Sequence, residues 1–170
     1  MRPFIPILAR TLHAVALSLW LGGLVAIGAL VAPLSFITLR GSSILTLEQA
    51  NSLAGHIIGG SLYFFNWLCI ACGLLLLFTN ALLLRHTRRR WALAAMTVTG
   101  LLLCTALYLG LSLTPTMDAA QAQGDRTNFD HLHHRYEQIS SIVQMPLLVL
   151  LALFGALRDT PCKNIEEGLS

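Results

Sequence analysis

The chain has 170 residues, of which 11 are Lys or Arg, 8 are Asp or Glu, and 55% are hydrophobic. Charged residues make up 11% of the sequence, whereas soluble domains carry about 25%. This composition excludes a soluble enzyme, a nucleic-acid-binding protein and a secreted disulfide scaffold. It indicates an integral membrane protein that is surrounded mainly by the lipid bilayer.

Four intervals of the sequence contain no charged residue, and each is long enough to cross a membrane as a helix. About 20 residues, rising 1.5 Å each, cover roughly 30 Å of hydrocarbon. We therefore predict an all-α fold, in which residues 1–170 form a single four-helix transmembrane bundle. The expected spans are residues 11–37, 57–84, 91–113 and 137–157.

The first of these intervals resembles a signal peptide only in being apolar. A signal-peptide core has about 7 to 15 apolar residues, and this run is about twice as long. We expect it to be retained as a helix.

Lys and Arg are divided unequally between the two ends of the predicted spans. Eight precede the first span, separate the second from the third or follow the fourth, and three lie in the other two connections. Cytoplasmic segments are enriched in these residues. We therefore expect a multi-pass protein of the cell inner membrane with both termini in the cytoplasm. Loops 40–56 and 114–134 would face the other side, and the first of them is expected to include a short helix.

Glycines and prolines inside the spans predict where the helices pack and bend. Glycine allows two helix backbones to approach closely in a membrane. Pro33 and Pro146 are expected to kink the first and fourth helices, because proline removes a backbone donor. The glycines expected at seams between helices are Gly22, Gly23, Gly28, Gly55, Gly59, Gly60, Gly73 and Gly100.

A histidine-rich segment precedes the fourth span and predicts an amphipathic helix that extends it over residues 128–137. Thr127 or Asn128 could cap this helix. His131 and His134 are three residues apart and therefore lie on one face. His56, at the start of the second span, should lie at a similar depth.

These three histidines are candidate metal ligands. Imidazole nitrogens together with the carboxylate of Asp118 or Asp130 would suit Cu(II) or Zn(II). The alternative is a solvated helix face on which histidines and carboxylates four residues apart pair with one another, such as His133 with Glu137.

His13 is the candidate cofactor ligand. It lies near the cytoplasmic end of the first span, and an ionisable residue inside a span suggests a function. It could be an axial ligand of haem, although the third span offers no second histidine.

Two stretches carry a resemblance to known families: LHAVALSLWLGGLVAIGALVAPLSF (Leu12–Phe36) and FDHLHHRYEQIS (Phe129–Ser140). Together with the spans between them, they resemble the family of domain of unknown function 4149, which is related to human transmembrane protein 205 and consists of small four-helix membrane proteins. The first stretch also resembles the membrane domain of copper resistance protein D, whose Leu-His and Trp-Leu-Gly-Gly elements are matched here by Leu12–His13 and Trp20–Gly23. The resemblance implies copper as a ligand, with His13 as the motif histidine, and supplies no catalytic residues.

The function expected from the sequence is therefore non-enzymatic. The leading hypothesis is a membrane protein that binds or helps to move a transition metal, copper foremost, through His56, His131 and His134. One alternative is an accessory subunit or assembly factor that packs against membrane-protein partners in a larger complex. A third possibility is a haem-binding membrane protein that uses His13.

Overall fold

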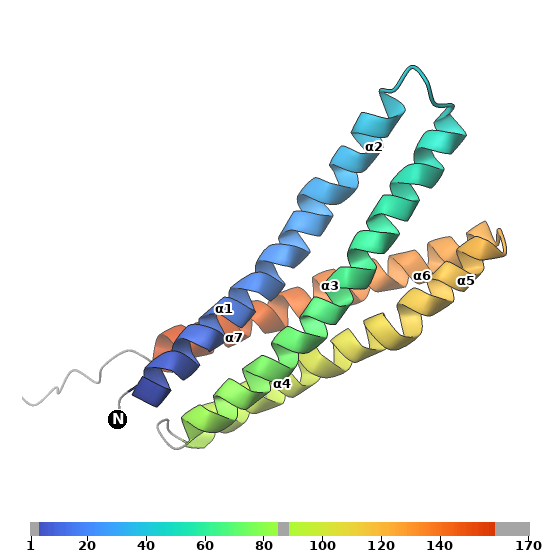
Figure 1. Cartoon of the computed structure of the whole chain (residues 1–170). Coiled ribbons are helices and arrows are strands. Elements are labelled where there is room, and N and C mark those ends of the chain that lie inside the picture. Colours follow the sequence, from blue (N-terminus) through green and yellow to red (C-terminus); the bar gives the residue numbers. More distant parts are fainter. Residues whose placement is uncertain (1–3, 85–88, 159–170) are drawn as a thin grey trace, which may run out of the picture.

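The computed structural model describes residues 4–84 and 89–158, and within these ranges the chain is helical apart from short connections. It forms four long helices arranged as two antiparallel hairpins (Figure 1). All four are apolar and long enough to cross a membrane. The all-α fold with four potential membrane spans, predicted from the charge-free intervals, is confirmed.

Three of the four long helices contain a π-helical segment. The second long helix is α3 (Leu47–Leu83) alone. The first consists of α1 (Phe4–Ala26), η1 (Ile27–Val31) and α2 (Ala32–Arg40). The third consists of α4 (Arg89–Tyr108), η3 (Leu109–Leu113) and α5 (Thr114–Ala122). The fourth consists of α6 (Arg126–Gln138), η4 (Ile139–Gln144) and α7 (Met145–Arg158).

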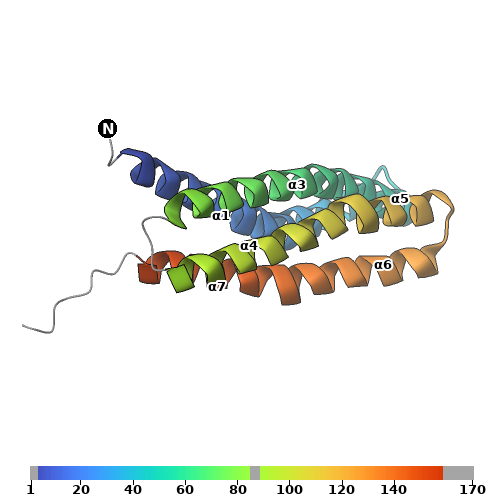
Figure 2. The same ribbon diagram turned by 90° about the horizontal axis from the view of Figure 1, so that it is seen from below.

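The two ends of the bundle differ in what they contain. The connections 41–46 and 123–125 lie at one end, which we call the loop end (Figures 1 and 2). The start of α1 and the end of α7 lie at the opposite end, which we call the terminal end. The arginine-rich connection at residues 85–88 lies outside the described residues.

The second long helix begins earlier than the sequence predicted. Thr46 and Gln49 form a capping box, in which the Thr46 side chain accepts from the Gln49 N–H at 3.3 Å and the Gln49 side chain accepts from the Thr46 N–H at 3.0 Å. A capping box satisfies two backbone donors and fixes a helix start. The helix therefore begins at Leu47 and not at residue 57. The short helix expected in the first loop is the first part of α3, and the loop itself is only residues 41–46.

The connection before the fourth helix is also shorter than expected. Gly124 has a φ of 71°, which glycine adopts without steric cost. Asp125 then caps α6, its carboxylate accepting from the Asn128 N–H at 3.1 Å. The cap is therefore Asp125 and neither Thr127 nor Asn128, and α6 covers the predicted extension over residues 128–137.

Each π-helical segment is followed by a proline at the second position of the next helix, namely Pro33, Pro115 or Pro146. A proline ring in a regular α-helix collides with the carbonyl four residues earlier and leaves it without a donor. A wider turn relieves the collision, because the residue before the proline bonds five residues back. The donors that do so are Ala32 to Ile27, Thr114 to Leu109 and Met145 to Ser140.

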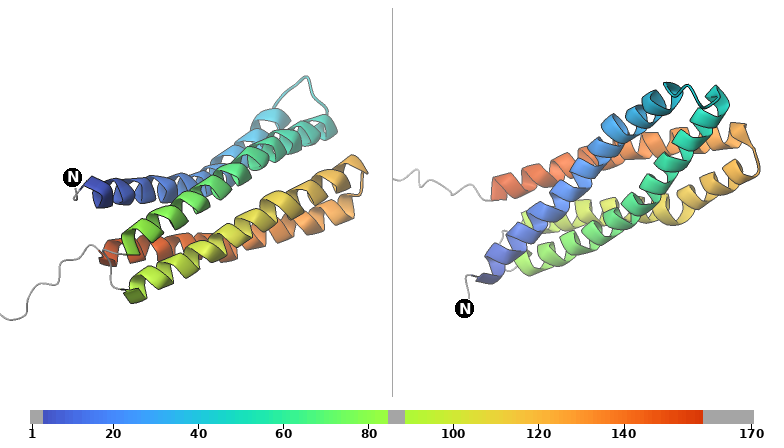
Figure 3. Two further views of the ribbon diagram at one scale, coloured as in Figure 1. Left: turned by 60° about the horizontal axis from the view of Figure 1, so that its bottom comes forward. Right: turned by 45° about the horizontal axis from the view of Figure 1, so that its top comes forward.

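The core lies toward the terminal end, where α1, α3, α4 and α7 meet. Trp20 of α1 is fully buried there with Leu76 of α3, Leu102 of α4 and Leu148 of α7. At the loop end the packing is pairwise, with α2 against α3 and α5 against α6. The two hairpins are therefore joined at one end and separate toward the other (Figures 1 and 3).

Two of the predicted glycine seams are close contacts between helices. A Cβ atom at Gly23 would overlap the ring of Phe65 on α3. A Cβ atom at Gly73 would lie 2.9 Å from Leu103 Cδ1 and 3.3 Å from Trp20 Cζ3. Small residues at these two positions let the first helix and α4 pack closely on α3.

Gly23→Ala should destabilise the protein, whereas Gly22→Ala should not. The first substitution forces the Phe65 ring out of place, which costs about 1–3 kcal/mol for an overpacked site. At Gly22 an added Cβ meets nothing within 4 Å, and alanine favours the helix by up to about 1 kcal/mol. Unfolding of both variants in mixed micelles measures the difference. Equal stabilities would contradict the close approach at Gly23.

Candidate functional site

A large space lies between the two hairpins, on the loop-end side of the core. This cavity has a volume of about 740 Å³, within the range of roughly 300–1,000 Å³ typical of small-molecule sites. All four long helices line it: the first over residues 24–36, α3 over residues 55–65, the third over residues 114–121 and the fourth over residues 129–145.

One wall of the cavity is apolar and includes several glycines and alanines. It is formed by two helices. The first long helix contributes Gly28, Ala29 and Ala32, and α3 contributes Gly55 and Gly59. A Cβ atom at Gly28 or Gly59 would meet no neighbouring atom within 4 Å. These glycines, predicted as packing seams, instead leave open space. The volume of the cavity therefore depends on the absence of a side chain at Gly28 and Gly59.

The opposite wall is polar and belongs to α5 and α6, which pack against each other. It presents Asp118 and Gln121 from α5, and Asp130, His133 and Glu137 from α6. Asp130, His133 and Glu137 follow a spacing of three and four residues, which places them on one face of α6. The cavity therefore has an apolar side and an acidic side.

His133 is held on this wall by two neighbours on its own helix. Its ring stacks on Phe129, with centroids 5.9 Å apart and an interplanar angle of 7°. Its Nε2 lies 3.3 Å from a carboxylate oxygen of Glu137. The His133–Glu137 pair expected from the four-residue spacing is confirmed. The other ring nitrogen, Nδ1, is buried and has no hydrogen-bond partner among the described residues.

A chain of hydrogen bonds forms the floor of the cavity and ties three long helices together. The Tyr136 hydroxyl donates to Asn66 Oδ1 at 2.9 Å, and Asn66 Nδ2 donates to Thr114 Oγ1 at 2.9 Å. Thr114 in turn donates to the Leu109 carbonyl at 2.8 Å, inside the wide turn of η3. All three side chains are buried. Buried polar groups in a membrane need such partners, so this chain fixes α3, α5 and α6 beneath the open space.

The three histidines predicted as metal ligands do not line the cavity. His56, His131 and His134 are exposed, and His134 contacts Gln138 at 3.1 Å and Glu137 at 3.8 Å. Within residues 4–84 and 89–158, no group of three or more His, Cys, Asp or Glu side chains is placed to hold a metal ion. Metal binding by His56, His131 and His134 therefore stays a prediction that the geometry does not support.

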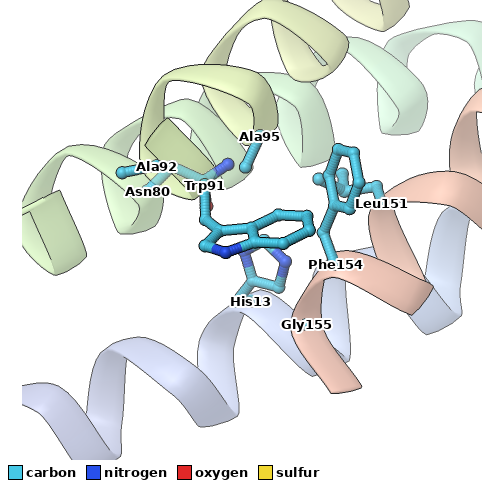
Figure 4. Close-up of a pocket in the computed structure, with 8 residues that line it drawn as sticks. All are labelled: His13, Asn80, Trp91, Ala92, Ala95, Leu151, Phe154 and Gly155. Carbon is cyan, nitrogen blue, oxygen red and sulfur yellow. The ribbon is translucent and has the colours of Figure 1, made fainter. Parts of the chain in front are cut away.

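His13, the predicted cofactor ligand, is buried in the core near the terminal end. Its Nδ1 lies 3.3 Å from Thr79 Oγ1, and this hydroxyl donates to the Leu76 carbonyl, so Nδ1 is the donor. Its ring faces Trp91 and Phe154, which form an edge-to-face pair 5.6 Å apart (Figure 4). The space beside it is about 10 Å³, room for about one water molecule. This pocket fits a histidine that joins helices and is far too small for haem.

Fold and site together define a multi-pass membrane protein: four apolar helices in two hairpins, with a two-sided cavity between them. Residues 15–126, about two thirds of the chain, match the family described as a domain of unknown function, DUF4149, and the chain belongs to this family. The match ends where α6 begins, so most of the acidic wall lies beyond it. No curated protein and no solved structure matches the chain significantly.

The cavity floor should behave as a coupled unit. Asn66→Leu and Tyr136→Phe each remove one side of the same hydrogen bond, so their effects on stability should be less than additive. The coupling energy should be about 0.6 kcal/mol, the average measured for hydrogen bonds between membrane helices, and should not exceed about 1.7 kcal/mol, the largest value measured. A double-mutant cycle of unfolding in mixed micelles measures it.

Tyr136→Phe combined with Thr99→Val provides the control pair. Thr99 bonds to Asn80 and to the Ala95 carbonyl, so these two changes should add within about 0.5 kcal/mol. Additivity in both cycles would show that Asn66 and Tyr136 are not coupled.

Proposed function

We propose that this protein is a non-catalytic membrane protein that binds an amphiphilic molecule in the cavity between its hairpins. The observation that carries the proposal is the division of one space into an apolar wall on the first helix and α3 and a polar wall on α5 and α6. Binding sites for small molecules combine a mostly apolar lining with a few convergent polar groups. An amphiphile would match both walls at once.

The position of the cavity along the bundle supports this proposal. The α3 helix has 37 residues and is therefore about 55 Å long, well beyond the roughly 30 Å of a hydrocarbon core. The polar sequence of α6 favours the headgroup region, whereas α7 is apolar. The cavity extends from Phe129 of α6 to Met145 of α7. It would therefore lie across the membrane surface, where an amphiphile keeps its head near water and its chain in hydrocarbon.

Filling the apolar wall should abolish binding. Gly59→Leu places a side chain in the open space, whereas Gly60→Leu, one residue further on the same helix, places it on the exposed surface outside the cavity. The probe is hexadecanol carrying a diazirine in its chain, added to the protein in phosphatidylcholine nanodiscs and crosslinked by light. We expect saturable labelling of α3 and α6 in the parent and in Gly60→Leu, and a reduction of about tenfold or more in Gly59→Leu, because the lost volume exceeds several methylene groups.

Labelling that does not saturate, or that is equal in both variants, would contradict a specific site. The melting temperatures of the two variants should agree, because a Cβ atom added at either position meets no neighbouring atom within 4 Å. If the melting temperature falls for Gly59→Leu alone, the test is repeated with Gly28→Leu, which fills the cavity from the first long helix.

We also propose that the loop end faces away from the cytoplasm, which would open the cavity to the outer leaflet. The excess of Lys and Arg in the sequence before the first helix, between the second and the third, and after the fourth supports this orientation. A membrane-impermeant maleimide added to intact cells should label Ser43→Cys in the loop 41–46. It should label the natural Cys162, in the segment after the fourth helix, only after permeabilisation. The reverse pattern would invert the orientation.

A further inference from the structure

The charges around the cavity are all of one sign. Asp118, Asp130 and Glu137 line it, and none of the Lys or Arg side chains in the described part of the chain does so. Glu137 contacts two histidines, whereas Asp118 and Asp130 have no ion-pair partner among the residues described. Of the arginines at the loop end, Arg40 is held at the edge of the apolar wall, where its Nε donates to Asn51 at 2.8 Å and its guanidinium lies over the ring of Phe36.

We propose that the ligand is an amphiphile with a primary ammonium head, and that the negative charge of Asp118, Asp130 and Glu137 attracts this head while the apolar wall holds its chain. This inference rests on the proposed function and names the chemical class of its ligand. Uncompensated negative charge beside a low-dielectric wall selects a cation, because the apolar surface weakens the screening of charge by water.

The distribution of the carboxylates favours an organic cation over a metal ion. They are spread along two helices and are not grouped closely enough to hold a metal. An ammonium can bond directly to one of these carboxylates, while the others contribute to the negative potential along the wall. His133 adds a further polar atom to this wall, its buried Nδ1, which has no hydrogen-bond partner among the described residues.

Anionic and zwitterionic heads fit the cavity less well. A sulfate, phosphate or carboxylate head would stand beside three carboxylates with no guanidinium or ammonium lining the space to offset the repulsion. A phosphatidylethanolamine brings a phosphate together with its ammonium. The site therefore favours a molecule whose only charge is the ammonium.

The test uses three hexadecyl probes with the same photoreactive diazirine, ending in a hydroxyl, an ammonium or a sulfonate. Each is titrated into the full-length protein in phosphatidylcholine nanodiscs, whose neutral surface does not itself attract one head. We expect the amine to half-saturate labelling of α3 and α6 at a concentration about tenfold below the alcohol, and the sulfonate above both, since the combined charge of three partly exposed carboxylates supplies that much discrimination. The preference for the amine should shrink in about 1 M salt, where the Debye length falls to roughly 3 Å.

The combined variant Asp118→Asn, Asp130→Asn, Glu137→Gln should lose the preference for the amine while still binding the alcohol. Glu48→Gln, a change of one carboxylate at the loop end outside the cavity, is the matched control and should leave the preference intact. Three probes of equal affinity, or a preference that survives the triple change, would overturn the ammonium proposal and leave the amphiphile site standing. Failure of the alcohol to label the parent protein would overturn the proposed function itself.

Discussion

The need to satisfy every backbone N–H and C=O group in hydrocarbon is the constraint on which the rest of this structure depends. Within the described residues, each long helix meets it continuously, even where Pro33, Pro115 and Pro146 remove a donor. The π-helical turns before these prolines keep the chain bonded by reaching one residue further back. All three segments include residues that line the cavity or hold its floor. The irregular backbone therefore lies beside the cavity and its floor.

Among the described residues, polar side chains join the helices below the cavity and not across it. His13 with Thr79 and Asn80 with Thr99 join helices near the terminal end, and the Tyr136–Asn66–Thr114 chain joins them at the cavity floor. Above that floor, the polar residues of α5 and α6 face an apolar wall and cannot bond across it. Since helix association in a membrane relies on packing and interhelical hydrogen bonds, the hairpins are held together below the cavity and only pairwise beside it.

The four spans could be predicted from the sequence, whereas the cavity between the hairpins could not. Particular residues show the physical reasons. Charge-free intervals identify membrane helices because charge is costly in hydrocarbon, but they do not detect the capping box at Thr46 or the cap at Asp125, which lengthen the helices at the loop end. Spacing correctly paired His133 with Glu137 and placed His131 and His134 on one face. It could not tell which face of α6 turns inward, because that rotation is set by the packing of α6 on α5. The available signal was the stripe Phe129, His133, Tyr136, Glu137 and Ser140, which mixes aromatic and polar residues on one helix face and lines the cavity throughout.

The acidic wall also explains why a histidine-rich helix need not be a metal site. In α6 the exposed histidines meet water and the neighbouring side chains of Glu137 and Gln138, whereas the inward His133 is stacked on Phe129 and directed at Glu137. One carboxylate thus contacts histidines on both faces, which keeps its charge at the cavity edge and orients the imidazole ring. Chelation would require ligands that converge on a point, and α5 and α6 instead distribute their charges along a surface. A surface of that kind, set against glycine and alanine, suits a molecule that is itself polar at one end and apolar over the rest of its length.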